Sequence, residues 1–197
     1  MIQKDLTDFW GSINQVLTPE IAQVLGISAS DFPSWTVRST LNVGDAKITG
    51  VEANYTRKLD FIPGWGKYFN FTTNGTSLNL TGPNGTDFRQ FIERSGNIAL
   101  SFNKKPVVTQ VKLNYRGRQL VSPGTGTFNN YYESRFNIDV NFEYTYSKRL
   151  KIFMNARNIL NEPQNTQLYS PDSAVYARLS RSEEFGIQLA AGIKGSW

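Results

Sequence analysis

The sequence predicts an all-β protein: an antiparallel transmembrane β-barrel, or a fragment of one with about seven to eight strands. Apolar and polar residues alternate with a period of two in seven segments. These segments run to about 10 to 15 residues, whereas strands of globular sheets usually have five or six. A tilted membrane strand with some overhang has this length. The connections between the segments also alternate between short and long, as they do in outer-membrane barrels.

The segment 132–146 shows the alternation most clearly. Its apolar face carries Tyr132, Phe136, Ile138, Val140, Phe142, Tyr144 and Tyr146, together with Ser134. Its polar face carries Glu133, Arg135, Asn137, Asp139, Asn141, Glu143 and Thr145. The aromatic residues stand toward both ends of the apolar face, with aliphatic residues between them. A bilayer with an aromatic belt at each interface favours this distribution.

Six further segments are predicted as strands: 47–60, 67–79, 94–103, 107–120, 150–158 and the terminal stretch from Phe185 to Trp197. In 47–60, Arg57 falls in the apolar register. It stands near the next turn, where we expect its charge to snorkel to the membrane interface. The terminal stretch alternates as Phe185, Ile187, Leu189, Ala191, Ile193, Gly195 and Trp197. A last strand that ends on an aromatic residue is typical of the signal that the barrel-assembly machinery reads.

The connections set an orientation. The short ones, at 61–66, 103–106 and 147–149, are predicted to be periplasmic turns. The long ones, at 11–36, 80–93, 121–131 and 159–181, are predicted to be extracellular loops, so the terminal strand ends at the periplasmic face. Within the first loop, residues 18–25 are expected to form a short helix. Thr18 is a capping residue, Pro19 suits the first helical position, and Gly26 suits the stop.

Composition excludes several classes of function. The chain has no cysteine and no histidine, so thiol chemistry and the commonest general base and metal ligand are missing. Its net charge of +5 is scattered along the chain, which argues against a nucleic-acid partner. We find no set of nucleophile, base and orienting residue and no phosphate-binding loop. We therefore expect no enzyme, no cofactor and no metal site. The N-terminus lacks the apolar region of a signal peptide, so we expect Met1 to lie inside a longer exported protein.

Several motifs, in order, resemble the C-terminal part of a TonB-dependent outer-membrane receptor. The first are Gly50-Val51-Glu52-Ala53-Asn54-Tyr55 and Leu59-Asp60-Phe61-Ile62-Pro63-Gly64-Trp65, similar to a strand-turn-strand block of that family. They are followed by Asn114-Tyr115-Arg116-Gly117-Arg118, then Asn155-Ala156-Arg157-Asn158-Ile159-Leu160-Asn161-Glu162-Pro163, and finally Phe185 to Trp197. The series extends over the whole chain, with Trp at the end where Phe is more usual.

The resemblance implies an integral barrel of the bacterial outer membrane that imports a scarce nutrient of the siderophore, cobalamin or glycan class. The family's barrels have twenty-two strands around an N-terminal plug and draw energy through the TonB complex. The implied partners are outer-membrane lipid, the rest of the barrel, the plug, the TonB complex and the assembly machinery. This sequence has no plug and no recognisable TonB box. It would supply about a third of the barrel wall.

The candidate functional residues fall into three groups. The polar faces supply a lumen or ligand path: Lys112, Arg116, Arg118, Arg135, Asp139, Glu143 and Arg157. Arg116 and Arg118 are predicted to share one face, where two guanidinium groups bind carboxylate or phosphate well. The loops supply aromatic side chains, for which two roles stay open: stacking on a sugar or a chelate, or packing within the loops and the outer aromatic girdle. They are Trp35, Phe88, Phe128, Tyr169 and Tyr176. The assembly signal is Phe185, Ile187, Leu189, Ile193 and Trp197. For each polar residue the alternative is a lumen that is merely hydrated.

Two other protein classes remain open on the sequence. One is a complete eight-stranded outer-membrane barrel that acts as an adhesin or a structural protein. It requires a first strand in residues 1–10, where Ile2, Leu6 and Trp10 alternate weakly. The other is a soluble all-β carbohydrate-binding module, in which two apolar faces pack together. That module predicts aromatic residues in the middle of strands, and in 132–146 they stand toward the ends.

Overall fold

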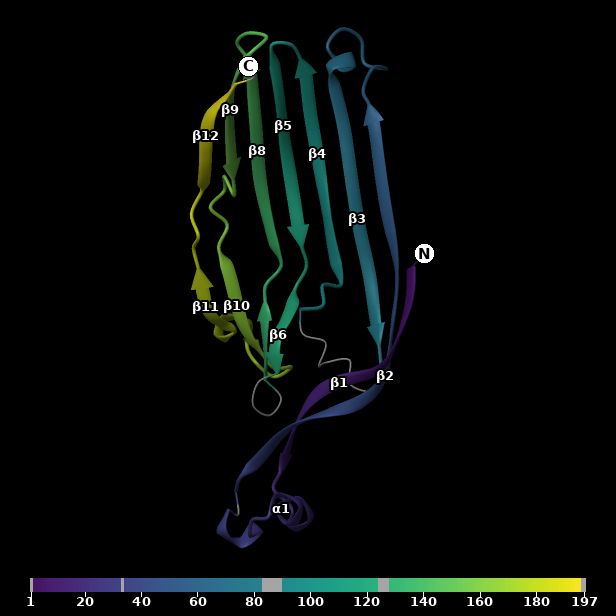
Figure 1. The fold of residues 1–197 in the computed structure, drawn as a ribbon, viewed down its shortest axis with the longest axis vertical. Helices are drawn as coiled ribbons and strands as arrows, with labels where there is room; N and C mark the ends of the chain where they lie inside the picture. The colour runs from purple at the N-terminus through teal and green to yellow at the C-terminus, as the bar shows by residue number, and fades with distance from the viewer. Residues whose placement is uncertain (1, 33, 83–89, 124–127, 196–197) are drawn as a thin grey trace.

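One long antiparallel sheet dominates the computed structural model, which describes residues 2–32, 34–82, 90–123 and 128–195 (Figure 1). The sheet has eight strands in the order β1-β2-β3-β4-β5-β8-β9-β12. Their bounds are β1 Ile2–Val16, β2 Thr36–Lys58, β3 Phe69–Thr81, β4 Arg94–Lys104, β5 Val107–Arg116, β8 Arg135–Thr145, β9 Leu150–Arg157 and β12 Gln188–Gly195. The all-β prediction is thereby confirmed. The sheet is open: β1 and β12 lie at opposite edges, and no ladder joins them within the described part of the chain.

A smaller sheet of four strands continues the large one. It has the order β11-β10-β7-β6, with β6 Gln119–Pro123, β7 Asn129–Tyr132, β10 Gln164–Tyr169 and β11 Leu179–Glu183. In sequence, β6 follows β5, β7 precedes β8, β10 follows β9 and β11 precedes β12. Four neighbouring strands are therefore interrupted at one level and then resume with the same neighbours. We call this interruption, at residues 117–118, 133–134, 158–163 and 184–187, the break.

The register of the large sheet collects the apolar positions of its strands on one face. Residues directly opposite each other in neighbouring strands share a face. One row across the sheet is Phe71, Leu100, Val111, Val140, Ala156 and Leu189. The next row is Phe69, Phe102, Thr109, Phe142, Met154 and Ala191. Six separately predicted alternations thus merge into one continuous surface, which we call the apolar face.

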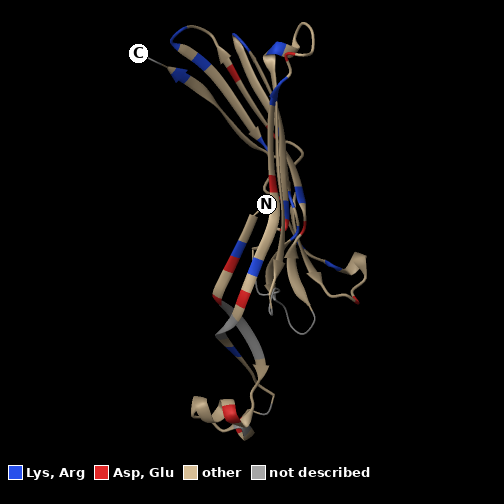
Figure 2. Cartoon of the chain, turned by 90° about the vertical axis from the view of Figure 1, so that its right-hand side faces the viewer, with Lys and Arg blue, Asp and Glu red and all other residues tan. Residues whose placement is uncertain are grey.

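This fold has almost no core, because a single sheet leaves both of its faces open. The buried hydrophobic residues of the described chain are few and mostly small: Leu17, Ala22, Ala46, Ala99, Leu120 and Ala156. Large side chains of the apolar face are exposed instead, with Val111 at 40%, Phe136 at 43% and Ile193 at 68%. The side view in Figure 2 shows this one-layer arrangement.

The first long loop was predicted too long. The range 11–36 was expected to be irregular outside its helix, but β1 continues to Val16 and β2 begins at Thr36. Together they form a hairpin that reaches far beyond the rest of the sheet (Figure 1). The weak alternation near the N-terminus hid this strand, which is specified by its pairing with β2. The predicted helix is confirmed as α1, Pro19–Leu25, with Thr18 as its N-cap and Gly26 in a left-handed conformation at its end.

Two other predicted loops contain the strands of the small sheet. The range 121–131 overlaps β6 and β7, and 159–181 overlaps β10 and β11. These strands have four to six residues and little alternation, so pairing with neighbours decides their conformation. The strand predicted over 107–120 is divided by the break into β5 and β6. The terminal strand begins at Gln188 instead of Phe185, because Gly186 adopts a positive φ of 74° just before it.

The three predicted turns lie together at one end of the large sheet. They join β2 to β3, β4 to β5 and β8 to β9, and β12 ends at the same level (Figure 1). We call this the short-turn end. The β2–β3 connection also contains the 3₁₀ helix η2, Gly66–Tyr68; two further 3₁₀ helices, η1 (Ala29–Asp31) and η4 (Val175–Ala177), lie in the long connections. Among the described residues, no helix is both long enough and apolar enough to cross a membrane.

Candidate binding face

The face opposite the apolar face is lined by amide side chains, and we call it the polar face. One row across five strands consists entirely of asparagine: Asn54, Asn74, Asn97, Asn114 and Asn137. Asn74 and Asn97 exchange two hydrogen bonds of 3.2 and 2.8 Å between their amide groups. The sequence predicts that each of these asparagines lies on the polar face of its own strand. Only the strand register brings them into one row.

A second polar row lies closer to the short-turn end. Its members are Lys58, Asn70, Ser101, Gln110, Asn141 and Asn155. The Gln110 amide donates a 2.9 Å hydrogen bond to the Ser101 hydroxyl. Each row presents donors and acceptors about 4.8 Å apart, which is the spacing of neighbouring strands. Such a surface suits contact with water or with a polar partner.

Two arginines stand directly opposite each other where the polar face meets the break. Arg116 is the register partner of Arg135. Arg116 Nη2 donates to Gln164 Oε1 at 2.7 Å, and Arg135 Nη2 donates to the Glu162 carbonyl at 2.9 Å. Like charges in directly opposite positions destabilise a sheet. Neutral oxygens from the 158–164 segment thus hold a pair of cations that lacks a carboxylate partner among the described residues.

The two arginines retain unused hydrogen-bonding capacity. The Nε atoms of Arg116 and Arg135 are both buried, and neither has a hydrogen-bond partner in the described structure. A buried donor without an acceptor costs free energy, more so when it is charged. An acidic group placed against this pair would relieve both the repulsion and the missing hydrogen bonds.

The predicted pairing of Arg116 with Arg118 is replaced by the pairing with Arg135. Strand β5 ends at Arg116, so Arg118 lies within the break. The Arg118 guanidinium stacks on Tyr131, 4.3 Å from the ring centroid, and lies 5.0 Å from the ring of Tyr169. Arg116 instead lies 5.6 Å from the Tyr132 ring. Because the break interrupts the strand, a two-residue spacing no longer places side chains on one face.

Asn158 joins the two sides of the break. It is only 6% exposed and has a positive φ of 53°. Its side-chain amide donates to the carbonyls of Glu162 and Gly186, at 3.2 and 3.3 Å, and its side-chain oxygen accepts from Glu162 N at 3.0 Å. Its backbone N–H donates to Asp139 Oδ1 at 3.1 Å. One asparagine therefore connects β8, β9 and the segment before β12.

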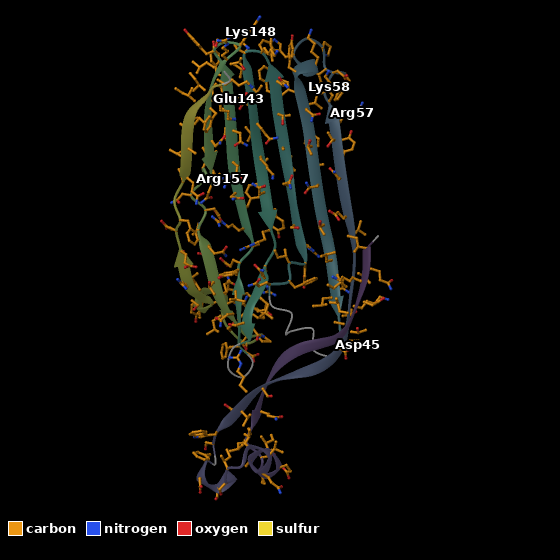
Figure 3. The ribbon with its side chains drawn as sticks, viewed as in Figure 1. Asp45, Arg57, Lys58, Glu143, Lys148 and Arg157 are labelled. Carbon is orange, nitrogen blue, oxygen red and sulfur yellow. The ribbon has the colours of Figure 1, made fainter. Side chains whose placement is uncertain are left out.

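A polar cavity of about 190 Å³ lies beside Asn158. Its lining includes Arg135, Asn137, Asp139, Arg157, Phe185 and Gln188. Three predicted lumen residues therefore meet in one cavity, although they come from two strands. Phe185, predicted for the apolar set of the terminal strand, borders this polar cavity because the turn at Gly186 moves it out of the strand. Figure 3 shows Arg157 near this level of the sheet.

The remaining charged candidates have roles within the sheet. Lys112 is the register partner of Asp139, and Asp139 also accepts a 3.0 Å hydrogen bond from the Asn114 amide. Glu143 lies toward the short-turn end (Figure 3) and pairs with Lys151 at 2.7 Å and Lys194 at 3.1 Å. That triad connects β8, β9 and β12. It leaves Glu143 less free to bind a ligand than the sequence indicated.

The predicted loop aromatics are in diverse surroundings. Tyr176 is 92% exposed and Trp35 is 60% exposed, with the Trp35 ring 4.3 Å from that of Phe32. Phe128 is exposed beside β7. Tyr169 belongs to β10, and its ring centroid is 5.0 Å from the guanidinium group of Arg118 and 4.8 Å from that of Arg178. Phe88 lies outside the described residues.

The residues of the predicted assembly signal are divided by the turn at Gly186. Leu189 and Ile193 lie on the apolar face in β12, at 71% and 68% exposure. Ile187 precedes the strand, and Trp197 lies outside the described residues. Within the described part of the chain, no group of three or more acidic side chains is placed to hold a metal ion. No family model, no curated protein and no solved structure matches this chain.

Proposed function

We propose that this chain forms the C-terminal wall of the barrel of a TonB-dependent outer-membrane receptor, a protein that imports a scarce nutrient. The observation that carries the proposal is the continuous, uncovered apolar face. An apolar surface that extends over six strands requires an apolar partner. A bilayer covers such a face without a second layer of protein, so the sheet stays one layer thick.

The dimensions of the apolar face favour a membrane. Phe136 and Tyr115 are register partners near the break, and Tyr144 and Tyr146 stand at the short-turn end. From Phe136 to Tyr146 there are ten residue steps, or about 33 Å at 3.3 Å per residue. With a strand tilt of about 40°, the apolar band is roughly 25 Å high, the height typical of outer-membrane barrels. Aromatic residues mark both of its borders.

The break supports the same orientation. Backbone groups outside a ladder are costly in hydrocarbon, so irregular backbone belongs outside the lipid-facing region. The four strands are interrupted just beyond the row of Tyr115 and Phe136, where the apolar band ends. The small sheet and the long hairpin would then extend from the outer surface. The short-turn end would face the periplasm.

The polar face is suited to the lumen of a wide barrel. In the proposed receptor it would contact the plug and border the path of the ligand. The Arg116 and Arg135 pair, the cavity beside Asn158 and the stacked residues Arg118 and Tyr169 all lie toward the outer end. Their chemistry favours an anionic ligand or an acidic segment of the plug.

The sheet edges favour a larger barrel over the alternatives. Upper β2, from Val51 to Lys58, pairs only with β3 in the described structure, and β12 pairs only with β9. A complete eight-stranded barrel requires these edges to join. A soluble module requires a second layer over the apolar face. A larger barrel satisfies both edges with further strands.

Two measurements test the proposal. Reading the gene upstream of Met1 is expected to show an in-frame signal peptide, a plug-like domain and more alternating strands. A stop codon and a ribosome-binding site directly before Met1 would contradict the receptor and favour the small barrel or the soluble module. Separately, the chain is expected to aggregate in water and to gain β structure when diluted from urea into lipid vesicles. A monodisperse, folded monomer in buffer would refute the membrane assignment.

A further inference from the structure

An aromatic cluster with associated cations stands on the apolar face at the short-turn end. Trp65 stacks on Phe102 with ring centroids 5.9 Å apart and an interplanar angle of 21°. Tyr68 meets both rings edge-on at 6.2 Å, and Phe69 lies 5.0 Å from Phe102. We call Trp65, Tyr68, Phe69 and Phe102, with the cations described next, the rim cluster.

Three cations lie over the faces of aromatic rings at this rim. Lys104 Nζ is 4.2 Å from the Trp65 centroid and 5.0 Å from that of Tyr68. Lys67 Nζ is 5.2 Å from the Tyr68 centroid. Beside the four rings, the Arg57 guanidinium is 4.9 Å from the ring of Phe61. Arg57 and Lys104 occupy the apolar register at the ends of their strands, and the rings hold their charges at the border of the band.

These three cations have no carboxylate partner in the described structure. A ring face contacts one side of an ammonium or guanidinium group and leaves its other N–H donors free. The ion pairs of the described residues involve Glu143 and Glu183 instead. Three positive charges are therefore fixed in position at the membrane border while their hydrogen-bonding capacity remains open.

The whole short-turn end is strongly basic. Figure 2 shows Lys and Arg gathered there. Residues 57–68, 103–107, 143–151 and 193–195 contain nine basic and two acidic residues. The basic ones are Arg57, Lys58, Lys67, Lys104, Lys105, Lys148, Arg149, Lys151 and Lys194; the acidic ones are Asp60 and Glu143. Glu143 already pairs with two lysines. The excess charge attracts an anion to this rim.

We propose that the rim cluster binds the phosphate of anionic phospholipids in the adjoining membrane leaflet. The aromatic rings lie at headgroup depth, and the cations over them present free donors to phosphate oxygens. A zwitterionic headgroup carries its own ammonium group, which competes for the same phosphate, so an anionic headgroup binds better. The proposal rests on the membrane location proposed above and adds the lipid class and the residues that select it.

Trp65 provides a local probe for the test. A chain with Trp10, Trp35 and Trp197 changed to Phe keeps Trp65 as its one tryptophan. This variant is reconstituted in phosphatidylcholine vesicles that contain phosphatidylglycerol. In separate samples, the acyl chains of one lipid or of the other are brominated. One basic side chain at the membrane surface is expected to enrich the anionic lipid around it about five-fold. Brominated phosphatidylglycerol is therefore expected to quench Trp65 about five-fold more per mole than brominated phosphatidylcholine.

Two double variants each remove two lysine charges, one pair at the rim and the other pair away from it. K67Q/K104Q, which leaves Arg57 in place, is expected to lower the ratio of the two quenching efficiencies toward one. K4Q/K47Q, on the hairpin away from the rim, is expected to leave it unchanged. Far-UV circular dichroism of each reconstituted variant shows whether the β structure is retained.

The outcomes separate the two proposals. Equal quenching by both lipids in the unsubstituted background refutes selective binding while leaving the membrane location intact. Equal loss of selectivity in both double variants also refutes it, since the rim would then have no special role. If neither brominated lipid quenches Trp65, the residue does not lie in a bilayer, and the proposed membrane function fails.

Discussion

Placing the same charge on the two faces of β5 tests the membrane proposal most directly. Val111 and Val108 belong to one strand but point to opposite faces of the sheet. Their exposures are similar, 40% and 36%. We expect Val111→Arg to destabilise the membrane-inserted chain strongly and Val108→Arg to have little effect. The substitution is identical, so helix or strand propensity cannot explain a difference.

The depth of Val111 sets the magnitude. It pairs with Val140, which is four residues from Phe136 and six from Tyr146. At about 3.3 Å per residue and a tilt of about 40°, Val111 lies roughly 2 to 3 Å from the middle of the apolar band. Arginine facing lipid at this depth costs about 2 to 4 kcal/mol. That corresponds to about a 30- to 700-fold change in the unfolding equilibrium constant.

Val108 is a suitable control because its side chain has space and a counter-charge. It borders a polar-face cavity of about 310 Å³, and its register partner is Glu143. The assay is equilibrium unfolding by urea of the chain inserted in phosphatidylcholine vesicles, followed by tryptophan fluorescence. Equal destabilisation by the two substitutions, or a neutral Val111→Arg, would refute the assignment of the apolar face to lipid.

Three further predictions concern local structure, and the same unfolding assay measures the first two. Asn158→Ala removes the side-chain hydrogen bonds across the break and is expected to cost about 1 to 3 kcal/mol, because buried partners are left unpaired; an unchanged midpoint would contradict the role given to the Asn158 side chain. Gly50→Ala is expected to destabilise the fold by about 1 to 3 kcal/mol through overpacking, because the added Cβ would clash with the backbone oxygen of Ser77. Gly75→Ala, whose nearest atom would be 3.9 Å away, is expected to be tolerated. The hydrogen bond from the Thr18 side chain, followed by one from the backbone, lowers the pKa of Glu20. A carboxyl group whose pKa is lowered by folding stabilises the fold at pH values above its ordinary pKa. This contribution is lost as the pH falls through the pKa of folded Glu20. Thr18→Ala is therefore expected to raise the Glu20 pKa toward its ordinary range and reduce this acid sensitivity, as an NMR titration of Glu20 would show; no change in that pKa would rule out the hydrogen bond between the Thr18 and Glu20 side chains.

Local patterns were sufficient where a single segment carries its own signal. The alternation in 132–146 predicted β8, and the sequence Thr18-Pro19-Glu20 with Gly26 predicted α1. The side-chain period of two is a property of each strand by itself, so it can be read without knowing the neighbours. Capping is equally local, since it involves residues three or four positions apart.

The break was beyond local analysis. The strand predicted over 107–120 continues through Gly117, and nothing in that segment shows that Arg118 leaves the face of Arg116. The interruption depends on four strands stopping at one level, with Asn158 bonding to residues in two of them. The short strands of the small sheet likewise depend on pairing with distant segments, as the register partners Tyr169 and Asn129 illustrate.

The sequence by itself determined the strand class, the two-faced character of the strands and the capped helix, because these follow from periodicity and short-range hydrogen bonding. Only the tertiary structure decided which residues are neighbours across strands: the asparagine row, the opposed Arg116 and Arg135, and the cations over the rim cluster. The physical reason is that register is set by pairing between distant segments. A shift of one residue would have moved every one of these side chains to the other face.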